Sequence, residues 1–241
     1  RGNLKANNRE YMQRRRIMKI GIVYTGTTPE LIDDVNKQIH KVLGNNVELL
    51  TYGDVTILSD VITYGDVYSK PAAKLIRLYS QAIMDGAEAI LNTCSSVGEI
   101  VDSMQSFADV AGVPIVRIDE EMCREAVIGY DNIAVMATLS STLNPTVGTI
   151  RHMAKVCGKK INITEILVEN AFGIEQNVFK EKMLEYAEKY AGESDIILLA
   201  QGSMSYCEEF LRDKLGKAVV SSPSFGARAL KEALVKKGAV K

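Results

Sequence analysis

Short runs of β-branched and apolar residues alternate with longer amphipathic stretches from residue 18 onward. A strand-length apolar run followed by a helix-length amphipathic stretch is typical of parallel strands joined by helices. The repetition of this pattern along the chain predicts an α/β fold with parallel sheets. Strands are expected at residues 19–24, 47–51, 89–92, 114–118, 132–137, 161–168, 196–200 and 218–221. Helices are expected at residues 29–43, 70–85, 99–111, 120–127, 144–157, 178–191, 205–215 and 224–236.

The predicted elements form two copies of one half. Residues 20–25 can be laid on residues 133–138, and residues 88–94 on residues 195–201. Both pairs match in the pattern of residue types rather than in identity. We therefore predict two pseudo-symmetric Rossmann-like halves, each with a parallel sheet, and a cleft between them. The first half is expected to comprise residues 18–118 and 216–241, and the second half residues 119–215.

The first 17 residues differ from the rest, because they are polar and basic and have no apolar period. We expect residues 1–17 to be a disordered arm, or sequence upstream of a natural start at Met18, and we leave them out of the fold prediction. A basic arm that contacts RNA is the alternative. Charge is otherwise balanced, with 29 Lys and Arg against 30 Asp and Glu, so no nucleic-acid partner is expected.

Several functional classes are excluded by what the sequence lacks. No apolar run approaches the roughly 20 residues that span a bilayer, and the N-terminus has no signal-peptide core, so we expect a cytoplasmic protein without membrane contact. The 4 cysteines form no CxxC pair, which argues against a disulfide framework and a zinc site. With 2 histidines, no histidine-based metal site or triad is expected. Acid–base chemistry should therefore come from cysteine, tyrosine or carboxylates.

Four loops that follow predicted strands are rich in small hydroxyl residues. The carboxyl ends of parallel strands form the ligand-binding edge of such sheets, so these loops should converge in the cleft. Backbone N–H groups beside small side chains favour a carboxylate or phosphate. In any single loop these residues are explained as helix caps, but four loops together indicate an anion site. The candidate binding residues are Thr25, Ser95, Ser96, Thr138, Ser141, Thr142, Gln201, Gly202 and Ser203.

Cys94 stands where a predicted strand ends and a helix begins. A helix N-terminus and nearby N–H groups lower the pKa of a thiol, so we expect Cys94 to act as a base or nucleophile. Cys123 and Cys157 lie inside helical patterns and are expected to be buried structural residues. Cys207 is expected to lie one helical turn beyond reach of the ligand.

Four longer strings surround these residues: Asn92-Thr-Cys-Ser-Ser-Val-Gly98, Val113-Pro-Ile-Val-Arg-Ile-Asp-Glu120, Ala137-Thr-Leu-Ser-Ser-Thr-Leu-Asn-Pro-Thr146 and Leu199-Ala-Gln-Gly-Ser-Met204. Together they resemble the aspartate/glutamate/hydantoin racemase superfamily, from Met18 almost to the C-terminus. The resemblance implies two pseudo-symmetric halves with one cysteine each, which exchange protons with opposite faces of a carbon next to a carboxylate. It implies no cofactor and no metal, and it suggests a homodimer.

The sequence departs from this pattern at the second cysteine. The resemblance matches Cys94 and the two serines after it to the first-cysteine motif, and Thr25 and residues 138–142 to carboxylate-binding turns. The repeat, however, places Gln201 at the second cysteine, and a looser alignment places Ser203 there. An amide cannot take a proton from carbon at neutral pH, and a serine needs a helper base. We therefore expect a one-cysteine variant.

The expected function is a cofactor-independent isomerase of the racemase type, acting on a small amino, hydroxy or dicarboxylic acid by proton transfer or addition through Cys94. A one-cysteine decarboxylase or other lyase of the same superfamily is the first alternative. A non-catalytic ligand-binding protein is the second. A flavodoxin-like FMN module is the third, because residues 24–28 follow the first strand as a phosphate loop does, although the chain has no Trp to stack on a flavin.

Overall fold

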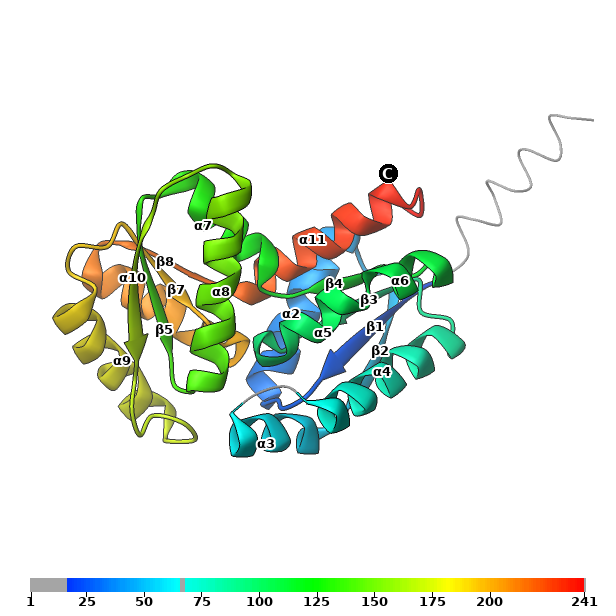
Figure 1. Cartoon of the computed structure of the whole chain (residues 1–241), viewed down its shortest axis with the longest axis horizontal. Coiled ribbons are helices and arrows are strands. Elements are labelled where there is room, and N and C mark those ends of the chain that lie inside the picture. The colour runs from blue at the N-terminus through cyan, green and yellow to red at the C-terminus, as the bar shows by residue number, and fades with distance from the viewer. Residues whose placement is uncertain (1–16, 66–67, 241) are drawn as a thin grey trace, which may run out of the picture.

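The computed structural model describes residues 17–65 and 68–240, so all but one residue of the predicted N-terminal arm lies outside it. These residues form two four-stranded parallel sheets, one in each half (Figure 1). The first sheet has the spatial order β2 (Val47–Gly53), β1 (Met18–Tyr24), β3 (Ala89–Asn92) and β4 (Ile115–Arg117). The second has the order β6 (Asn162–Leu167), β5 (Asn132–Ala137), β7 (Ile196–Leu199) and β8 (Ala218–Ser221).

Helices cover both faces of the first sheet because its central strands bury side chains on both sides. Ile22 and Leu91 pack on one face, against helices α2 (Pro29–Leu43) and α11 (Ser222–Lys236). Val23 and Ile90 pack on the other face. That face is covered by α3 (Val55–Tyr64), α4 (Ser69–Met84), α5 (Gly98–Ser103) and α6 (Gln105–Ala111).

The second sheet is covered in the same way. Ile133 and Val135 pack against α7 (Glu120–Gly129) and α8 (Ser140–Val156). Ala134 and Met136 face the opposite layer, which contains α9 (Gln176–Tyr190), the 3-10 helix η2 (Gly202–Cys207) and α10 (Glu208–Leu215). Each half therefore has two apolar layers of its own, and α8 lies on the side of the second half that faces the first (Figure 1).

The two sheets share one topology and one register, which confirms the predicted fold class. β1 pairs with β3 so that Ile20 lies opposite Ala89, and β5 pairs with β7 so that Ile133 lies opposite Ile196. Laying residues 20–25 on 133–138 makes Ile20 equivalent to Ile133, and laying 88–94 on 195–201 makes Ala89 equivalent to Ile196. The two observed pairs are therefore equivalent. The same correspondence makes β2 equivalent to β6 and β4 equivalent to β8.

The chain crosses between the halves twice, before α7 and after β8. Because β8 pairs with β7, the return to the first half begins at Ser222 rather than at residue 216. Helix α11 then packs against α2 and β3. A Cβ added at Gly226 would lie 2.8 Å from the Cα of Ile118. The glycine thus lets α11 touch the backbone of the other crossing.

One helix is missing from the prediction and two predicted helices differ from the structure, each for a local reason. Helix α3 was not predicted, although Asp54 caps its N-terminus by accepting the N–H of Thr56. The predicted helix 99–111 is divided at Met104 into α5 and α6. Helix α8 begins at Ser140 rather than at residue 144, so Pro145 lies inside it, where it cannot donate the usual backbone hydrogen bond.

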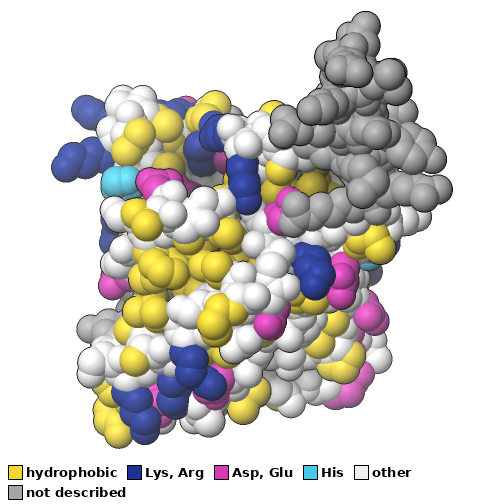
Figure 2. Space-filling view, turned by 90° about the vertical axis from the view of Figure 1, so that its right-hand side faces the viewer, with side chains coloured by type: hydrophobic (Ala, Val, Ile, Leu, Met, Phe, Trp, Pro, Cys, Tyr) yellow, Lys and Arg dark blue, Asp and Glu magenta, His cyan; other side chains and the backbone are white. Residues whose placement is uncertain are grey.

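The face of the first half that is turned away from the second half exposes a group of apolar side chains (Figure 2). Met84, Phe107 and Val110 are among the exposed large apolar residues of this half. Surfaces of this kind are often buried when proteins associate. The expected homodimer stays a prediction. Within the described residues, no helix is long and apolar enough to cross a membrane.

Candidate active site

Cys94 and Gln201 occupy equivalent backbone positions in the two halves. Cys94 lies just after β3 and Gln201 just after β7. The residue before each donates its N–H to the neighbouring inner strand, to β1 in the first sheet and to β5 in the second. Each is the N-cap of a 3-10 helix, Cys94 of η1 (Ser95–Val97) and Gln201 of η2. Their φ and ψ angles are −117° and 113° for Cys94, and −103° and 127° for Gln201. The two side chains therefore leave the backbone in the same way.

The loops that carry these residues are joined across the two halves. The Ser95 hydroxyl donates to the carbonyl of Ala200 over 3.3 Å, directly before Gln201. The Ser96 hydroxyl is 2.9 Å from that of Thr142 in the first turn of α8. All of these groups are buried. The end of β3 is thus held against both the end of β7 and the start of α8.

The Cys94 thiol is partly buried, and its pKa is raised rather than lowered. Burial is the largest cause, because it penalises the thiolate, and the nearby Asp119 carboxylate adds to the rise. Interactions with the Thr25 side chain and with Ser96 lower the pKa by less. The predicted effect of a helix N-terminus is weak because η1 is a single turn and α5 has only 6 residues. The expected low pKa is therefore wrong for the ligand-free protein.

A buried chain of hydrogen bonds ends at the backbone carbonyl of Cys94. The Tyr79 hydroxyl donates to Oδ1 of Asn92 over 3.1 Å, and Nδ2 of Asn92 donates to the carbonyl of Cys94 over 2.9 Å. Tyr79 and Asn92 are almost completely buried. Sequence reasoning missed both residues, although an Asn at the end of the apolar strand Ala-Ile-Leu-Asn was a signal for the second.

Gln201 is held from the side by Thr138. Its Oε1 accepts the backbone N–H of Thr138 over 2.7 Å and the Thr138 hydroxyl over 3.0 Å. Two of the candidate residues of the second half, Thr138 and Gln201, therefore bind each other in the ligand-free structure. Gly202 follows in η2, where an added Cβ would lie 3.1 Å from Cδ1 of Leu31, so a larger residue would press on α2. Ser203 is partly buried in the same turn.

Buried hydroxyl groups without partners lie at several strand ends. Within the described residues, no hydrogen bond of normal geometry is made by the side-chain oxygens of Tyr24, Thr25, Ser141 and Ser222. Thr25 is nevertheless near enough to Cys94 to favour its thiolate. Burying a hydroxyl without a partner costs free energy. These groups can therefore bind polar atoms of a ligand or water at little further cost.

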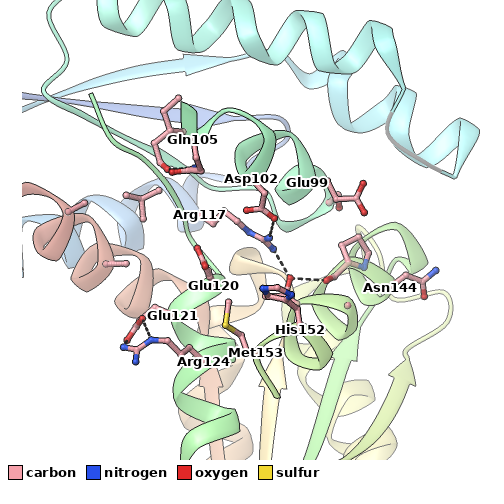
Figure 3. A pocket seen from close by; sticks show the side chains of 18 of the residues that line it. Glu99, Asp102, Gln105, Arg117, Glu120, Glu121, Arg124, Asn144, His152 and Met153 are labelled. Carbon is pink, nitrogen blue, oxygen red and sulfur yellow. Dashed lines mark hydrogen bonds and ion pairs between the residues drawn. The ribbon is translucent and has the colours of Figure 1, made fainter. Parts of the chain in front are cut away.

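A buried arginine beside the Cys94 loop joins the two halves. Arg117 ends β4, pairs with Asp119 at 3.1 Å and Asp102 at 2.8 Å, and donates to Thr149 of α8 over 2.8 Å. A Cβ added at Gly98 would lie 2.5 Å from its Cζ, so a larger residue there would displace the guanidinium. Figure 3 shows this side chain among residues from both halves. Two carboxylates already pair with its guanidinium, which leaves it poorly suited to bind a substrate carboxylate.

A groove of about 1380 Å³ runs between α5, α7, α8 and α11 (Figure 3). Ser96 and Ser141 belong to its lining, but Cys94 and Gln201 do not. The groove therefore lies beside the strand-end loops rather than over the thiol.

The other cysteines differ from one another. Cys123 is buried in the apolar layer under α7, as predicted, and burial raises its pKa. Burial raises the pKa of Cys207 to about 12. Cys157 is exposed, because it caps the C-terminus of α8 at the surface, so its predicted burial is wrong. In the described part of the chain, no cluster of three or more His, Cys, Asp or Glu residues could hold a metal ion.

Solved structures share this arrangement of two halves. Glutamate racemase from Francisella tularensis is 14% identical, with a TM-score of 0.66 over 93% of this chain and 84% of that one. Aspartate racemase from Picrophilus torridus is 14% identical, with a TM-score of 0.62 over 92% of this chain and 94% of that one. An unliganded arylmalonate decarboxylase is 12% identical, with a TM-score of 0.59 over 90% and 92%. At these identities the likeness concerns the fold.

Sequence comparison identifies the family directly. The comparison with curated protein sequences returned no match. The family profile described as Asp/Glu/Hydantoin racemase matches residues 20–230, which covers all but the first two residues of the two sheets and includes the loops that carry Cys94 and Gln201. The chain therefore belongs to the Asp/Glu/Hydantoin racemase family, a family of isomerases.

Proposed function

We propose that the protein catalyses proton transfer at the carbon next to the carboxylate of a small acid in the cytoplasm, with Cys94 as its proton carrier. The observation that supports this most is the equivalence of Cys94 and Gln201 at the two strand ends. One position can hold or release a proton at the substrate carbon, and the other cannot. The proposed chemistry therefore acts on one face of the substrate.

Neutral groups hold the substrate carboxylate in this proposal. The strand-end loops contain no Lys or Arg, and Arg117 is already paired with two carboxylates. The unpartnered hydroxyls of Thr25 and Ser141 and the backbone N–H groups of η1 are neutral donors at this site. Hydroxyl and backbone donors of this kind stabilise carboxylates and enediolates in other enzymes.

The raised pKa of Cys94 favours a thiol that begins the reaction protonated. A protonated thiol donates to an enediolate and leaves a thiolate, which water then reprotonates. This supports a lyase as a second candidate, in which a carbon–carbon bond breaks, CO₂ leaves and the Cys94 proton takes its place. The fold similarity to an arylmalonate decarboxylase is compatible with that candidate. No cofactor takes part in either proposed reaction.

Proton exchange in deuterated water tests the proposal. A panel of amino, hydroxy and dicarboxylic acids is followed by NMR for loss of the α-proton, and substituted malonates are followed for CO₂ release. We expect one class to react with the unmodified protein and with Cys157→Ser, which alters an exposed residue outside the site. Cys94→Ala should be inactive. Turnover that survives this change would refute a role for the thiol.

A further inference from the structure

We propose that Gln201 is a catalytic hydrogen-bond donor, whose Nε2 group binds the substrate oxygen that gains negative charge when Cys94 takes the proton from the α-carbon. This inference rests on the proposed function and adds a role for the residue at the second strand end. It also assigns Thr138 to positioning Gln201 rather than to binding the carboxylate directly.

The orientation of the amide follows from its partners. A backbone N–H can only donate, so the atom of Gln201 that faces the Thr138 N–H at 2.7 Å must be the oxygen. The Thr138 hydroxyl reinforces this arrangement by donating to the same oxygen. Turning the amide over would place Nε2 against the backbone N–H of Thr138, so that two donors would face each other and that bond would be lost. The Nε2 group is therefore directed away from Thr138.

The Nε2 group is available to a ligand. No hydrogen bond joins it to another residue in the part of the chain that the structure describes, and the Gln201 side chain is only partly buried. The contact between Ser95 and the carbonyl of Ala200 brings the Cys94 loop against the residue directly before Gln201. A substrate between the two strand ends would thus meet a thiol on one side and an amide donor on the other.

Such a donor suits the reaction step. When the α-carbon loses its proton to the Cys94 thiolate, the carbon–hydrogen electron pair forms a C=C bond and a carboxylate oxygen gains negative charge. In the reverse step the enediolate carbon takes the proton from the Cys94 thiol, and that charge is lost. A neutral N–H group fixed beforehand stabilises the charged state without reorganisation. It also binds the ground-state carboxylate less tightly than a cation would, which limits uniform binding.

Alkylation of Cys94 tests this donor without a known substrate. Iodoacetate carries a carboxylate and iodoacetamide does not, so the ratio of their rates at Cys94 measures carboxylate binding beside the thiol. The rates are measured in a Cys157→Ser background, because that exposed thiol would otherwise react first, and the site is read by peptide mass spectrometry. Gln201→Met keeps the length of the side chain without a donor. Gln201→Glu keeps the acceptor for Thr138 and replaces the donor with a negative oxygen.

We expect Gln201→Met to lower the iodoacetate-to-iodoacetamide ratio by roughly tenfold, and Gln201→Glu to lower it further. The iodoacetamide rate should change less than about twofold, which shows that the thiol and the fold persist. Gln81→Met is the matched control, because Gln81 binds Asp85 at the end of α4, outside the site. An unchanged ratio in both Gln201 variants would overturn the inference.

Thr138 gives a second, independent readout. Thr138→Val removes the hydroxyl but keeps the backbone N–H, so we expect a smaller fall in the ratio, about threefold, with rescue by Thr138→Ser. With an acid found by proton exchange, Gln201→Met should lower kcat by about 10²–10³ and change KM less. If Cys94 is essential and these variants behave as the parent, the donor role fails while the proposed function stands. Activity without Cys94 would instead remove the proposed function itself.

Discussion

The ends of β3 and β7 have nearly the same backbone geometry but hold their N-cap residues differently. Cys94 is held from behind, through its own carbonyl, by a chain that begins in the apolar layer at Tyr79. Gln201 is held from the side, through its side chain, by Thr138. The first arrangement leaves the side chain free to react, and the second fixes its orientation. The fold thus preserves two positions while the residues there carry different chemistry.

The same contrast extends to the neighbouring strands. The register places Arg117 opposite Asn92 in the first sheet and Ser221 opposite Leu199 in the second. Arg117 reaches across to α8, whereas Ser221 donates to Glu208 within its own half. The long side chain that joins the halves beside the thiol therefore comes from the first half, and the equivalent residue of the second half makes no such contact among the described residues.

Removing the thiol at the first strand end should have the largest effect on turnover. We expect Cys94→Ala to lower turnover of an acid found by proton exchange by at least about 10³-fold, because no other residue at that strand end can carry the proton. The melting temperature should stay within a few degrees, since the side chain is only partly buried. Cys123→Ala changes a buried cysteine of α7, outside the strand-end loops, and serves as the comparison. Equal losses of activity in both variants would point to a structural effect.

Breaking the arginine pair should have the next largest effect, on stability. Arg117→Met would leave Asp119 buried without its cation, and we expect the free energy of unfolding to fall by about 3 kcal/mol at neutral pH. Urea denaturation measures the change. Ser221→Ala, at the equivalent place in the second half, should cost about 1 kcal/mol. Equal costs at the two positions would contradict the asymmetry between the halves.

Placing a cysteine at both strand ends tests whether the residue at the second end decides the stereochemistry of the product. Gln201→Cys places a second thiol at the position equivalent to Cys94, and we expect racemic product to accumulate from an acid that the parent handles on one face. The rate should fall, because the Nε2 donor is lost and a misplacement of about 1 Å lowers proton-transfer rates. Chiral chromatography measures the product, with Ser203→Cys as the control. Racemisation by the parent at a rate that needs two bases would show that the second base lies elsewhere.

Weakening the support behind Cys94 should have a moderate effect. Tyr79→Phe removes the donor to Asn92 while keeping the ring in the core, and we expect stability to fall by about 1 kcal/mol. We also expect kcat to fall several-fold with little change in KM, because the thiol loses its alignment rather than its contact with substrate. Tyr52→Phe removes a surface hydrogen bond to Asp85 and should change neither kinetic constant. A rise in KM alone would assign Tyr79 to binding.

The smallest effect should appear in the pH dependence of Cys94. Because burial raises its pKa, the thiolate fraction at neutral pH is small, and alkylation by iodoacetamide should accelerate as the pH rises past 8 without levelling there. Thr25→Val should shift this profile to still higher pH, since the Thr25 side chain favours the thiolate. A profile that levels below pH 8 would mean that the thiol is activated in the ligand-free protein.

Sequence patterns predicted the parts of this molecule that depend on local order and repetition. The eight predicted strands lie within a few residues of the described ones, and the inner strands β3 and β7 are buried on both sides, which makes a short apolar run a strong signal. The predicted equivalence of residues 20–25 and 133–138 is also confirmed by the strand register. Properties that depend on packing were not predictable in this way. The burial that outweighs local donors at Cys94, and the support from Tyr79, arise from contacts between distant segments.

The close approach of α11 to Ile118 has a mechanical consequence. The two crossings between the halves meet where Gly226 touches the backbone of Ile118, so the halves are linked at one place rather than at two separated points. Rotation about that place strains the connecting chain less than sliding does, and hinges of this kind use few residues. A rotation that opened the cleft about that place would have to break the Ser95–Ala200, Ser96–Thr142 and Arg117–Thr149 contacts. A side chain at residue 226 would push the crossings apart and loosen the axis of that motion.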